Sequence, residues 1–457
     1  MILFNTLSRT KEKFEAINPP MVRIYSCGPT VYDYTHIGHI RTYIFVDILQ
    51  RSLKFVGFEP KLVMNITDVG HLTSDADFGE DKMEKGAQKE GKTVWEIAKF
   101  YTDYFFKVMD SAGVQKPDVI CKATDHIPEM IALVKQLETK GYTYKTSDGI
   151  YFDTSKFADY TKLARLDIKG LQEGARVEKN PEKKSPTDFA LWKFTPSTTK
   201  RQMEWQSPWG RGFPGWHIEC SAMSMKYLGS TLDIHTGGVD HIPVHHTNEI
   251  AQSQAATKQK FVNYWLHAGH LVVEGKKMSK SLGNFLKLED IQKNGFEPLA
   301  LRYLFLTGHY RSTMNFEWSA LKGANQALKK LREKINNIQA PMTKAKIPKS
   351  NKYQKRFIDY ISDDLNIPEA LALVWEVVKS DLGTSEKRSL LLDWDKVLGL
   401  DLAKEEKIDK KILELAKKRD DLRSEKKWQE ADKIRIEIES KGYLLQDSNK
   451  GSVVKKK

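Results

Sequence analysis

The pattern of hydrophobic and polar positions near the N-terminus predicts a strand, a helix and a second strand. Residues 21–26 form a short apolar run that ends at Cys27-Gly28-Pro29, where Gly and Pro break regular structure. From Gly38 the apolar residues recur at helical spacing until Gly57, a stop signal. Residues 61–67 form the second apolar run. The apolar positions that fall near one helical stripe are Ile40, Tyr43, Ile44, Ile48, Leu49 and Leu53.

A strand, a helix and a strand within some fifty residues make a βαβ unit. Such units build parallel sheets that are covered by helices on both faces. Ligands of these sheets bind at the carboxyl ends of the strands. Cys27, His36 and Thr67 fall at these ends, so the sequence predicts an α/β domain with a ligand site there.

The middle of the chain interrupts this domain. Residues 115–215 read as an inserted region with a helix over 127–140, a strand over 149–152 and a Lys/Pro-rich loop over 178–186. The sheet is expected to resume near residues 232–235. We therefore predict a first half of the sheet domain over 1–114, an insertion over 115–215 and a second half over 216–317.

After Trp318 the pattern changes to long, charged amphipathic helices. We expect a helical bundle over 318–400, with a basic link at 344–355, and a small C-terminal unit with a basic tail over 401–457. The last three lysines are predicted to be disordered. Two apolar stripes are predicted near the end, one formed by Ile412, Leu415, Ala416 and Leu422, the other by Trp428, Ala431, Ile434 and Ile438 before a capping Gly442.

Composition adds bounds to this picture. A chain of 457 residues corresponds to about three domains at ~150 residues each. Lys+Arg exceed Asp+Glu by 73 to 60, a net charge of +13, which suits a polyanionic partner and a solvated basic surface equally. Three scattered cysteines make no disulfide framework and fit a reducing cytosol. No secretory signal is visible and no apolar run approaches ~20 residues, so we expect a cytoplasmic protein without a membrane partner.

His36-Ile37-Gly38-His39 stands where the first strand passes into the helix. The unpaired N–H groups at a helix start bind phosphates, Gly38 lets backbone approach a nucleotide, and the histidines can donate hydrogen bonds. Lys277-Met278-Ser279-Lys280-Ser281 is polar and followed by Gly283, so its lysines can swing over a phosphate chain. Each motif alone is a modest signal, because two histidines around a glycine and a Lys/Ser loop both recur by chance.

A second constellation has the chemistry of metal ligands. Cys27, Cys220, His245 and Glu249 offer two thiolates, an imidazole and a carboxylate, all plausible Zn²⁺ ligands. His245 and Glu249 are four apart in a helical stretch and share a face. No CxxC spacing ties the set, and from the residues alone His246 is as good a candidate as His245.

The two phosphate motifs, in this order, resemble the HIGH and KMSKS motifs of class I aminoacyl-tRNA synthetases. Chain order and neighbouring residues are similar to the cysteinyl-tRNA synthetases over nearly the whole length. The resemblance implies a Rossmann-like (HUP) parallel-sheet catalytic domain with an inserted connective domain, a helical bundle and a small anticodon-binding unit. It implies activation of L-cysteine by ATP to cysteinyl-adenylate and transfer to the terminal ribose of tRNA-Cys.

The family pattern also implies roles for single residues. His36, His39, Lys277 and Lys280 would be catalytic, and Gly38, Gly238 and Asp240 would bind ATP with them. Thr67, Trp216 and His235 would line the amino-acid pocket, with Gly237 allowing close approach of backbone. Zinc, held by Cys27, Cys220, His245 and Glu249, would coordinate the substrate thiolate, and Mg²⁺ would accompany ATP. The chain departs from the family pattern near Gly70 and Val244, which affects the expected shape of the pocket.

The C-terminal region carries the RNA side of the resemblance. Residues 362–370 and 431–447 resemble family segments, and helix-borne lysines and arginines over 417–427 would contact phosphates. Three rivals remain at this point: a ligase that passes cysteine to an amino sugar, a small-molecule nucleotidylyltransferase, and a non-enzymatic zinc-stapled RNA-binding protein. The long basic C-terminus disfavours the first, the length and the zinc set disfavour the second, and the intact phosphate motifs disfavour the third.

Overall fold

The computed structural model describes residues 1–70, 84, 86–87, 91–165, 181–196, 201–279, 283–337, 352–404, 409–448 and 451–456. Lys280 and most of the basic link over 344–355 lie outside these residues. Within the described part of the chain, no helix is both long and apolar enough to cross a membrane.

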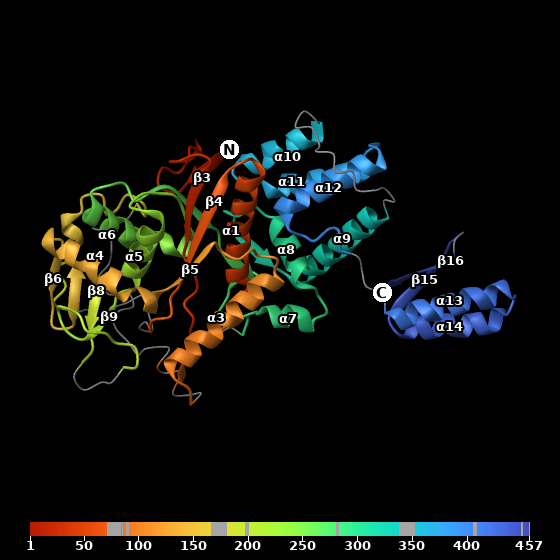
Figure 1. Cartoon of the computed structure of the whole chain (residues 1–457), viewed down its shortest axis with the longest axis horizontal. Coiled ribbons are helices and arrows are strands. Elements are labelled where there is room, and N and C mark those ends of the chain that lie inside the picture. The colour runs from red at the N-terminus through yellow and green to blue at the C-terminus, as the bar shows by residue number, and fades with distance from the viewer. Residues whose placement is uncertain are drawn as a thin grey trace.

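A five-stranded sheet forms the centre of the N-terminal two thirds of the chain (Figure 1). Its order is β11-β10-β3-β4-β5, and every pair is parallel. The strands are β3 (Met21–Ser26), β4 (Glu59–Ile66), β5 (Val119–Lys122), β10 (Leu232–Gly238) and β11 (Val262–Ala268). The predicted strands over 21–26 and 61–67 are thus β3 and β4, and the predicted parallel sheet is confirmed.

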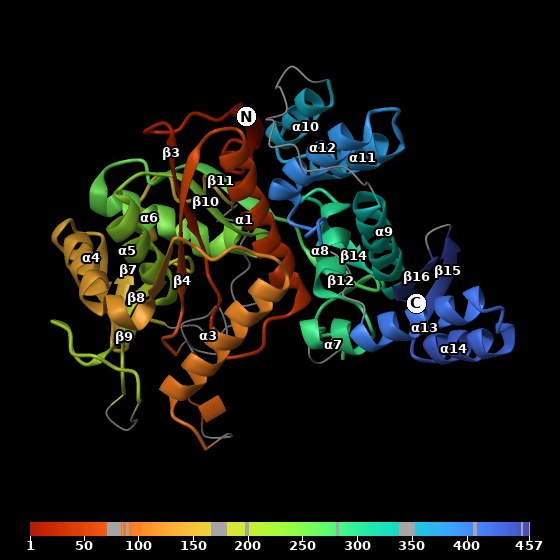
Figure 2. The ribbon, with the colours of Figure 1, turned by 45° about the vertical axis from the view of Figure 1, so that its right-hand side comes forward.

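Helices cover both faces of this sheet. On one face, α1 (Ile37–Phe55) and α3 (Val94–Ser111) share a core with alternate strand residues such as Ile24 and Ile66. On the other, α5 (Trp216–Leu228) and α6 (Thr247–Thr257) pack with strand residues such as Tyr25. Figure 2 shows α1 and α5 on opposite sides of the strands. Burial on both faces explains why the strands read as nearly continuous apolar runs.

The strand order reverses beside β3. The crossover through α1 leads from β3 to β4, whereas β10 pairs with β3 on its other edge. At such a switch point the connections leave the strands toward opposite faces, which opens a crevice at the carboxyl edge. The segments that follow β3 and β10 therefore border one crevice.

The inserted region forms a separate antiparallel sheet of order β6-β7-β8-β9 beside α4 (Ile127–Thr139). Its strands are β6 (Thr143–Lys145), β7 (Gly149–Phe152), β8 (Phe189–Phe194) and β9 (Gly212–Pro214). The parallel sheet continues through β5 to Lys122, beyond the boundary expected at residue 114. With four residues, of which only Cys121 is fully buried, β5 is too short to show a periodic pattern in the sequence.

Small elements and helices make up the rest of the chain. A hairpin of β1 (Ile2–Asn5) and β2 (Thr10–Lys13) precedes the sheet. A three-stranded sheet, β13-β12-β14, follows it, with β12 (Leu271–Val273), β13 (Lys276–Lys277) and β14 (Met314–Phe316). The helices around and after it are α7 (Leu288–Lys293), α8 (Pro298–Leu306), α9 (Trp318–Asn336), α10 (Lys352–Ser362), α11 (Ile367–Lys379) and α12 (Thr384–Leu398).

The C-terminal unit has a hydrophobic core of its own. It contains α13 (Lys410–Ser424), α14 (Trp428–Ser440) and a hairpin of β15 (Tyr443–Ser448) and β16 (Gly451–Lys456). Figure 1 shows it as a separate body at one end of the molecule. Its core cluster consists of Ile412, Ala416, Ile434, Ile438, Leu445 and Val454.

Two expectations for this unit were wrong. Trp428, expected on the apolar stripe, is 55% exposed because it stands at the first position of α14, where the guanidinium of Arg423 lies 5.6 Å from its ring. Lys455 and Lys456, expected to be disordered, belong to β16 and pair with Leu444 and Tyr443. A basic tail is therefore compatible with a strand when the partner strand supplies the apolar residues.

The separate core yields the first prediction. Ile438 is fully buried, so I438A should destabilise the C-terminal unit by about 2–5 kcal/mol through lost burial and a cavity. Amide hydrogen exchange should rise over residues 409–456 and stay unchanged in the parallel sheet. Increased exchange in β3 or β10 would show that the two cores unfold as one unit.

Candidate active site

A cavity of about 570 Å³ opens at the carboxyl edge of the parallel sheet. It lies at the switch point, between the segments that follow β3 and β10 and the strand β13. Most residues singled out in the sequence meet in its wall, although they come from distant parts of the chain. They are Cys27, His36, Gly38, His39, Thr67, Trp216, Cys220, Gly238, Asp240, His245 and Lys277.

The first motif forms the start of α1, as the sequence predicts. His36 is the N-cap residue, and its Nδ1 accepts hydrogen bonds from the backbone N–H groups of Gly38 and His39 at 3.1 and 3.3 Å. Burial lowers the pKa of His36 to about 4, so the ring is neutral at pH 7. The rings of His36 and His39 stack with centroids 3.6 Å apart. Because Nδ1 of His36 accepts, its N–H is on Nε2, and both histidines line the cavity.

The second motif touches the first. A Cβ atom at Gly38 would lie 2.9 Å from the His36 ring and 3.3 Å from Cε of Met278, so a larger residue there would displace the His36 ring or the end of the Met278 side chain. Asn284 braces the loop, because its side chain accepts from the N–H of Ser279 and donates to the carbonyl of Lys277. Lys277 lines the cavity at the exposed end of β13.

Other expected pocket residues surround the cavity at its inner end. Thr67 is buried and its hydroxyl donates to Oε2 of Glu219 at 3.1 Å. The Trp216 ring packs on that of His245 with centroids 4.6 Å apart. At the outer end, the Asp240 carboxylate lies 3.6 Å from Nδ1 of His270. The cavity thus joins a narrow buried end to a polar, open one.

The buried end holds a cluster of metal-ligand side chains. Two groups of four donor atoms lie within 4.8 Å of one another: Cys27, Cys220, His245 and Glu249, and Cys27, His235, His246 and Glu249. Both share Cys27 and Glu249. A π-helical turn over Ile242–His246 runs into α6 and presents both histidines to the same carboxylate, His245 at 3.1 Å and His246 at 3.9 Å from Oε1. The ambiguity between these two histidines in the sequence therefore persists in the geometry.

Charges within the first group favour ionised donors. Burial raises the pKa of Glu249, but His235 and His245 outweigh it and lower the value to about 2. Burial lowers the pKa of His245, yet Glu249 and Cys220 reverse this and raise it to about 10. A hydrogen bond from Cys27 lowers the pKa of Cys220 to about 7, whereas burial raises that of Cys27. The Glu249 carboxylate is thus ionised at neutral pH, and Cys220 is the thiol of this group that ionises more readily.

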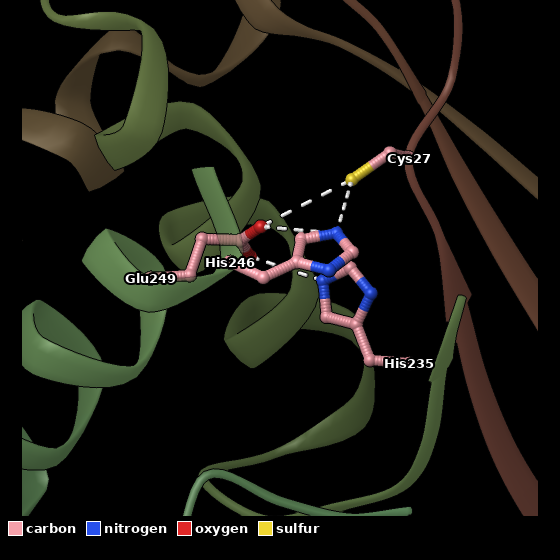
Figure 3. A group of neighbouring side chains, drawn as sticks. All are labelled: Cys27, His235, His246 and Glu249. Carbon is pink, nitrogen blue, oxygen red and sulfur yellow. Dashed lines mark hydrogen bonds and ion pairs between the residues drawn. The ribbon is translucent and has the colours of Figure 1, made fainter. Parts of the chain in front are cut away.

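The second group is enclosed more deeply. In Figure 3 the Cys27 sulfur faces His246 and Glu249, with Cys27 Sγ 3.3 Å from His246 Nε2. His246 Nδ1 lies 2.7 Å from His267 Nε2, and His267 Nδ1 lies 2.7 Å from the Thr6 hydroxyl. Neither His235 nor His246 lines the cavity, whereas Cys27, Cys220 and His245 do. A metal that keeps an open position for a ligand suits the first group better.

The positions of two histidines were not expected from the sequence. His235, expected in the pocket lining, is fully buried behind it, and its Nε2 lies 3.0 Å from Oε2 of Glu249. His217, which the sequence reasoning missed, has its Nδ1 3.0 Å from Nδ1 of His245. The available signal was its spacing, since residues 217 and 220 are three apart on α5 and share a face. Val244 is 39% exposed and does not line the cavity.

Comparison with known proteins shows which family the chain resembles. The family described as "tRNA synthetases class I (C) catalytic domain" matches residues 13–326. The "Cysteine--tRNA ligase 1" of Burkholderia lata is 48% identical over 99% of this chain and 96% of its own length. The "Cysteine--tRNA ligase" of Treponema denticola is 44% identical over 97% of each.

Solved structures resemble the chain in fold. A Mycobacterium tuberculosis methionyl-tRNA synthetase in complex with methionyl-adenylate gives a TM-score of 0.57 at 14% identity, over 83% of this chain and 90% of that one. An Agrobacterium radiobacter LeuRS complex with tRNA and LeuAMS gives 0.58 at 11% identity, over 85% and 84%. At these identities the likeness concerns the fold alone.

The two donor groups generate the second prediction. C220S removes a ligand from the first group only, and H246A removes one from the second only. We expect C220S to lower the metal retained after dialysis by at least roughly tenfold, because a hydroxyl does not replace a thiolate, and H246A to retain most of it. Elemental analysis measures the content, with C121S as the control because Cys121 is buried but belongs to neither group. Loss in H246A and retention in C220S would assign the metal to the second group.

Proposed function

The chain belongs to the cysteine–tRNA ligase family of class I tRNA synthetases and is a ligase; from this premise we propose how its cavity works. In the proposed reaction, the carboxylate of L-cysteine attacks the α-phosphate of ATP to give cysteinyl-adenylate and pyrophosphate. The terminal ribose hydroxyl of tRNA-Cys then takes the cysteinyl group and AMP leaves. The observation that carries the proposal is one cavity that joins both phosphate motifs to a buried cluster of cysteine, histidine and glutamate side chains.

The first step requires positioning and charge rather than proton transfer. A carboxylate is already ionised at neutral pH and needs no general base, so catalysis rests on orientation and on charge stabilisation of the transferring group. His36 and His39 line the cavity at the N-terminal end of α1, where the positive end of the helix dipole favours an anion, and they would donate to the triphosphate. Lys277 lines the same cavity and would stabilise the charge that develops on the phosphates. Lys280 is proposed to act with it, and Mg²⁺ to accompany the nucleotide.

The donor chemistry of the buried end fits zinc. Two sulfurs, one imidazole and one carboxylate are ligand types that Zn²⁺ takes in tetrahedral sites, and Cys27, Cys220, His245 and Glu249 supply them within 4.8 Å. When bound, zinc would supply a Lewis-acidic centre that prefers the thiolate of cysteine to the hydroxyl of serine. The chain's own contribution is to orient the ligands, through the contacts of His217 and His235 with His245 and Glu249.

The amino-acid pocket is proposed to lie beside these ligands. Thr67 and Trp216 line the same cavity as Cys27 and Cys220, and the Trp216 ring would limit the pocket to a small side chain. Gly238 and Asp240 at the open end would face the adenosine part of ATP. A site built around one specific polar partner rejects the analogue that lacks it by ~10⁴–10⁵, about 5.5–7 kcal/mol, which removes the need for an editing step against serine.

The RNA partner is proposed to contact the C-terminal helices. The basic residues of α13 and the following turn, Lys417, Lys418, Arg423, Lys426 and Lys427, are wholly or partly exposed. Such side chains hold a phosphate backbone without reading its sequence. Arg419 is fully buried against Asp447, so it supports the unit's structure instead of facing RNA.

The third prediction tests the activation step. Protein loaded with zinc should exchange labelled pyrophosphate into ATP with cysteine, and serine should support this at least ~10⁴-fold less efficiently. K277A should lower the rate by about 100-fold, or 2.7 kcal/mol, because it removes transition-state charge stabilisation. K276A is the matched control, since Lys276 is the neighbouring exposed residue of β13 but does not line the cavity. Exchange that occurs equally with serine would refute the proposed selectivity.

The fourth prediction separates the two steps. Removing residues after 404 deletes the C-terminal unit and keeps α12. It also keeps the carbonyls of Leu398, Leu400 and Asp401, which accept hydrogen bonds from Arg302 and Arg332. Pyrophosphate exchange should stay within about twofold, while charging of tRNA at limiting tRNA should fall at least ~100-fold through lost affinity. Undiminished charging would show that the C-terminal unit contributes little to tRNA binding. Pyrophosphate exchange without any tRNA charging by the full-length protein would instead favour a ligase with a small acceptor such as an amino sugar. Equal loss of both activities would show that the unit supports the catalytic fold.

A further inference from the structure

Arg41 makes an unusual set of hydrogen bonds. It lies on α1, two residues after His39, and is 4% exposed. Among the described residues, its guanidinium donates only to backbone carbonyls, none of them on its own helix. The acceptors are the oxygens of Gly269 at 2.7 Å, His270 at 2.8 Å, His309 at 3.2 Å, Tyr310 at 3.5 Å and Ser312 at 2.6 Å.

These carbonyls belong to two segments that carry the lysine strand. Residues 269–270 connect β11 to β12, and residues 309–312 connect α8 to β14. Strand β12 pairs with β14 on one side and with β13 on the other. Lys277 is the last residue of β13. The guanidinium of Arg41 therefore contacts the segments that lead into the small sheet that carries Lys277.

The two segments cross very closely at this point. The N–H of Gly269 donates to the carbonyl of Tyr310, and that of Met314 to the carbonyl of His270, at 2.8 and 2.9 Å. A Cβ atom at Gly269 would lie 2.5–2.6 Å from the carbonyl oxygens of Arg311 and Ser312. Several carbonyl dipoles therefore converge on one spot, where they would repel one another without a cation among them.

The charge of Arg41 has no acidic partner in the described residues. The three other buried arginines there form ion pairs: Arg302 with Asp47, Arg332 with Glu297 and Arg419 with Asp447. No carboxylate of the described chain lies within 4.0 Å of Arg41. Burial lowers its pKa only to about 10, so the group stays cationic at pH 7. Gly269 and His270 line the cavity, which places this cation directly behind its wall.

We propose that Arg41 is a positioning residue for adenylate formation: it fixes the separation between the His36–His39 end of α1 and the strand of Lys277. The role in adenylate formation rests on the proposed function. The role in holding the two segments together rests on the contacts of Arg41 alone, because its one planar guanidinium donates to carbonyls of both segments. Lysine keeps the charge but is a single point donor and cannot span the set.

The test compares two arginines of α1 in the full-length protein. R41K and R41Q remove some or all of the hydrogen bonds from residue 41 to the carbonyls of the two segments. R51K is the matched control. Arg51 donates to the carboxylate of Asp47 and to the carbonyls of Gly113 and Lys396, but it lies near the other end of the helix. The first readout is amide hydrogen exchange over residues 269–278 and 309–316. The second is the dependence of pyrophosphate exchange on ATP and on cysteine, measured with zinc-loaded enzyme.

Exchange of the amides over 269–278 should rise in R41K and R41Q and stay at the wild-type level in R51K. The kcat for pyrophosphate exchange should fall about 30- to 100-fold in R41K, since a displacement of ~1 Å costs about 10² in rate. The KM for cysteine should change less than about twofold, because the buried metal ligands are untouched.

Wild-type amide exchange over 269–278 in R41K would overturn the inference, and so would a kcat within about threefold of wild type. A parallel loss in R51K at equal melting temperature would also overturn it, because Arg41 would then only support the fold. If R41Q does not fold, R41K alone decides between these outcomes. Absence of cysteine-dependent exchange in the wild type would refute the proposed function, while amide exchange would still decide whether Arg41 holds the two segments.

Discussion

The parallel pairing of β3 with β10 is the constraint on which the rest of the site depends. Tyr25 lies opposite His235 and Ser26 opposite Thr236, so residues from both ends of the catalytic domain meet at one edge. Because the strand order reverses there, α1 leaves toward one face while α5 and α6 cover the other. The start of α1 with its two histidines and the donors of α5 and α6 are thereby brought to one crevice.

The buried carboxylate of Glu249 explains the polar character of the inner end. An isolated carboxylate is very unfavourable in a protein interior unless charges or hydrogen bonds compensate it. Glu249 is fully buried, and His235, His245 and His246 surround it. The sulfur of Cys27 lies 4.0 Å away. Such a cluster is expensive for a structural core and reasonable for a cation site, where ligands must be held before the metal or the substrate arrives.

The sequence predicted those features that leave a local signal. The strand at 21–26, the helix start at His36 and the lysine motif each have periodic or turn signals within a few residues. Contacts between distant segments leave no such signal. The position of His235 behind the pocket depends on Glu249, and the burial of Arg41 depends on carbonyls more than 200 positions away. Carbonyls are present at every residue, so the sequence could not show that these five form a binding site for a guanidinium.

Helix α1 therefore connects several parts of the molecule. Its first turn borders the cavity, Arg41 reaches the sheet of Lys277, and Asp47 forms a fully buried ion pair with Arg302 of α8 at 2.6 Å. Arg302 also donates to the carbonyl of Leu398 at the end of α12. Breaking a buried pair leaves an uncompensated charge and costs several kcal/mol, so these contacts resist independent movement of the helix. The helical bundle and the edge of the sheet that borders the cavity thus share one rigid element, and a displacement of the bundle at α12 must be transmitted to α1 or absorbed at the Asp47–Arg302 contact.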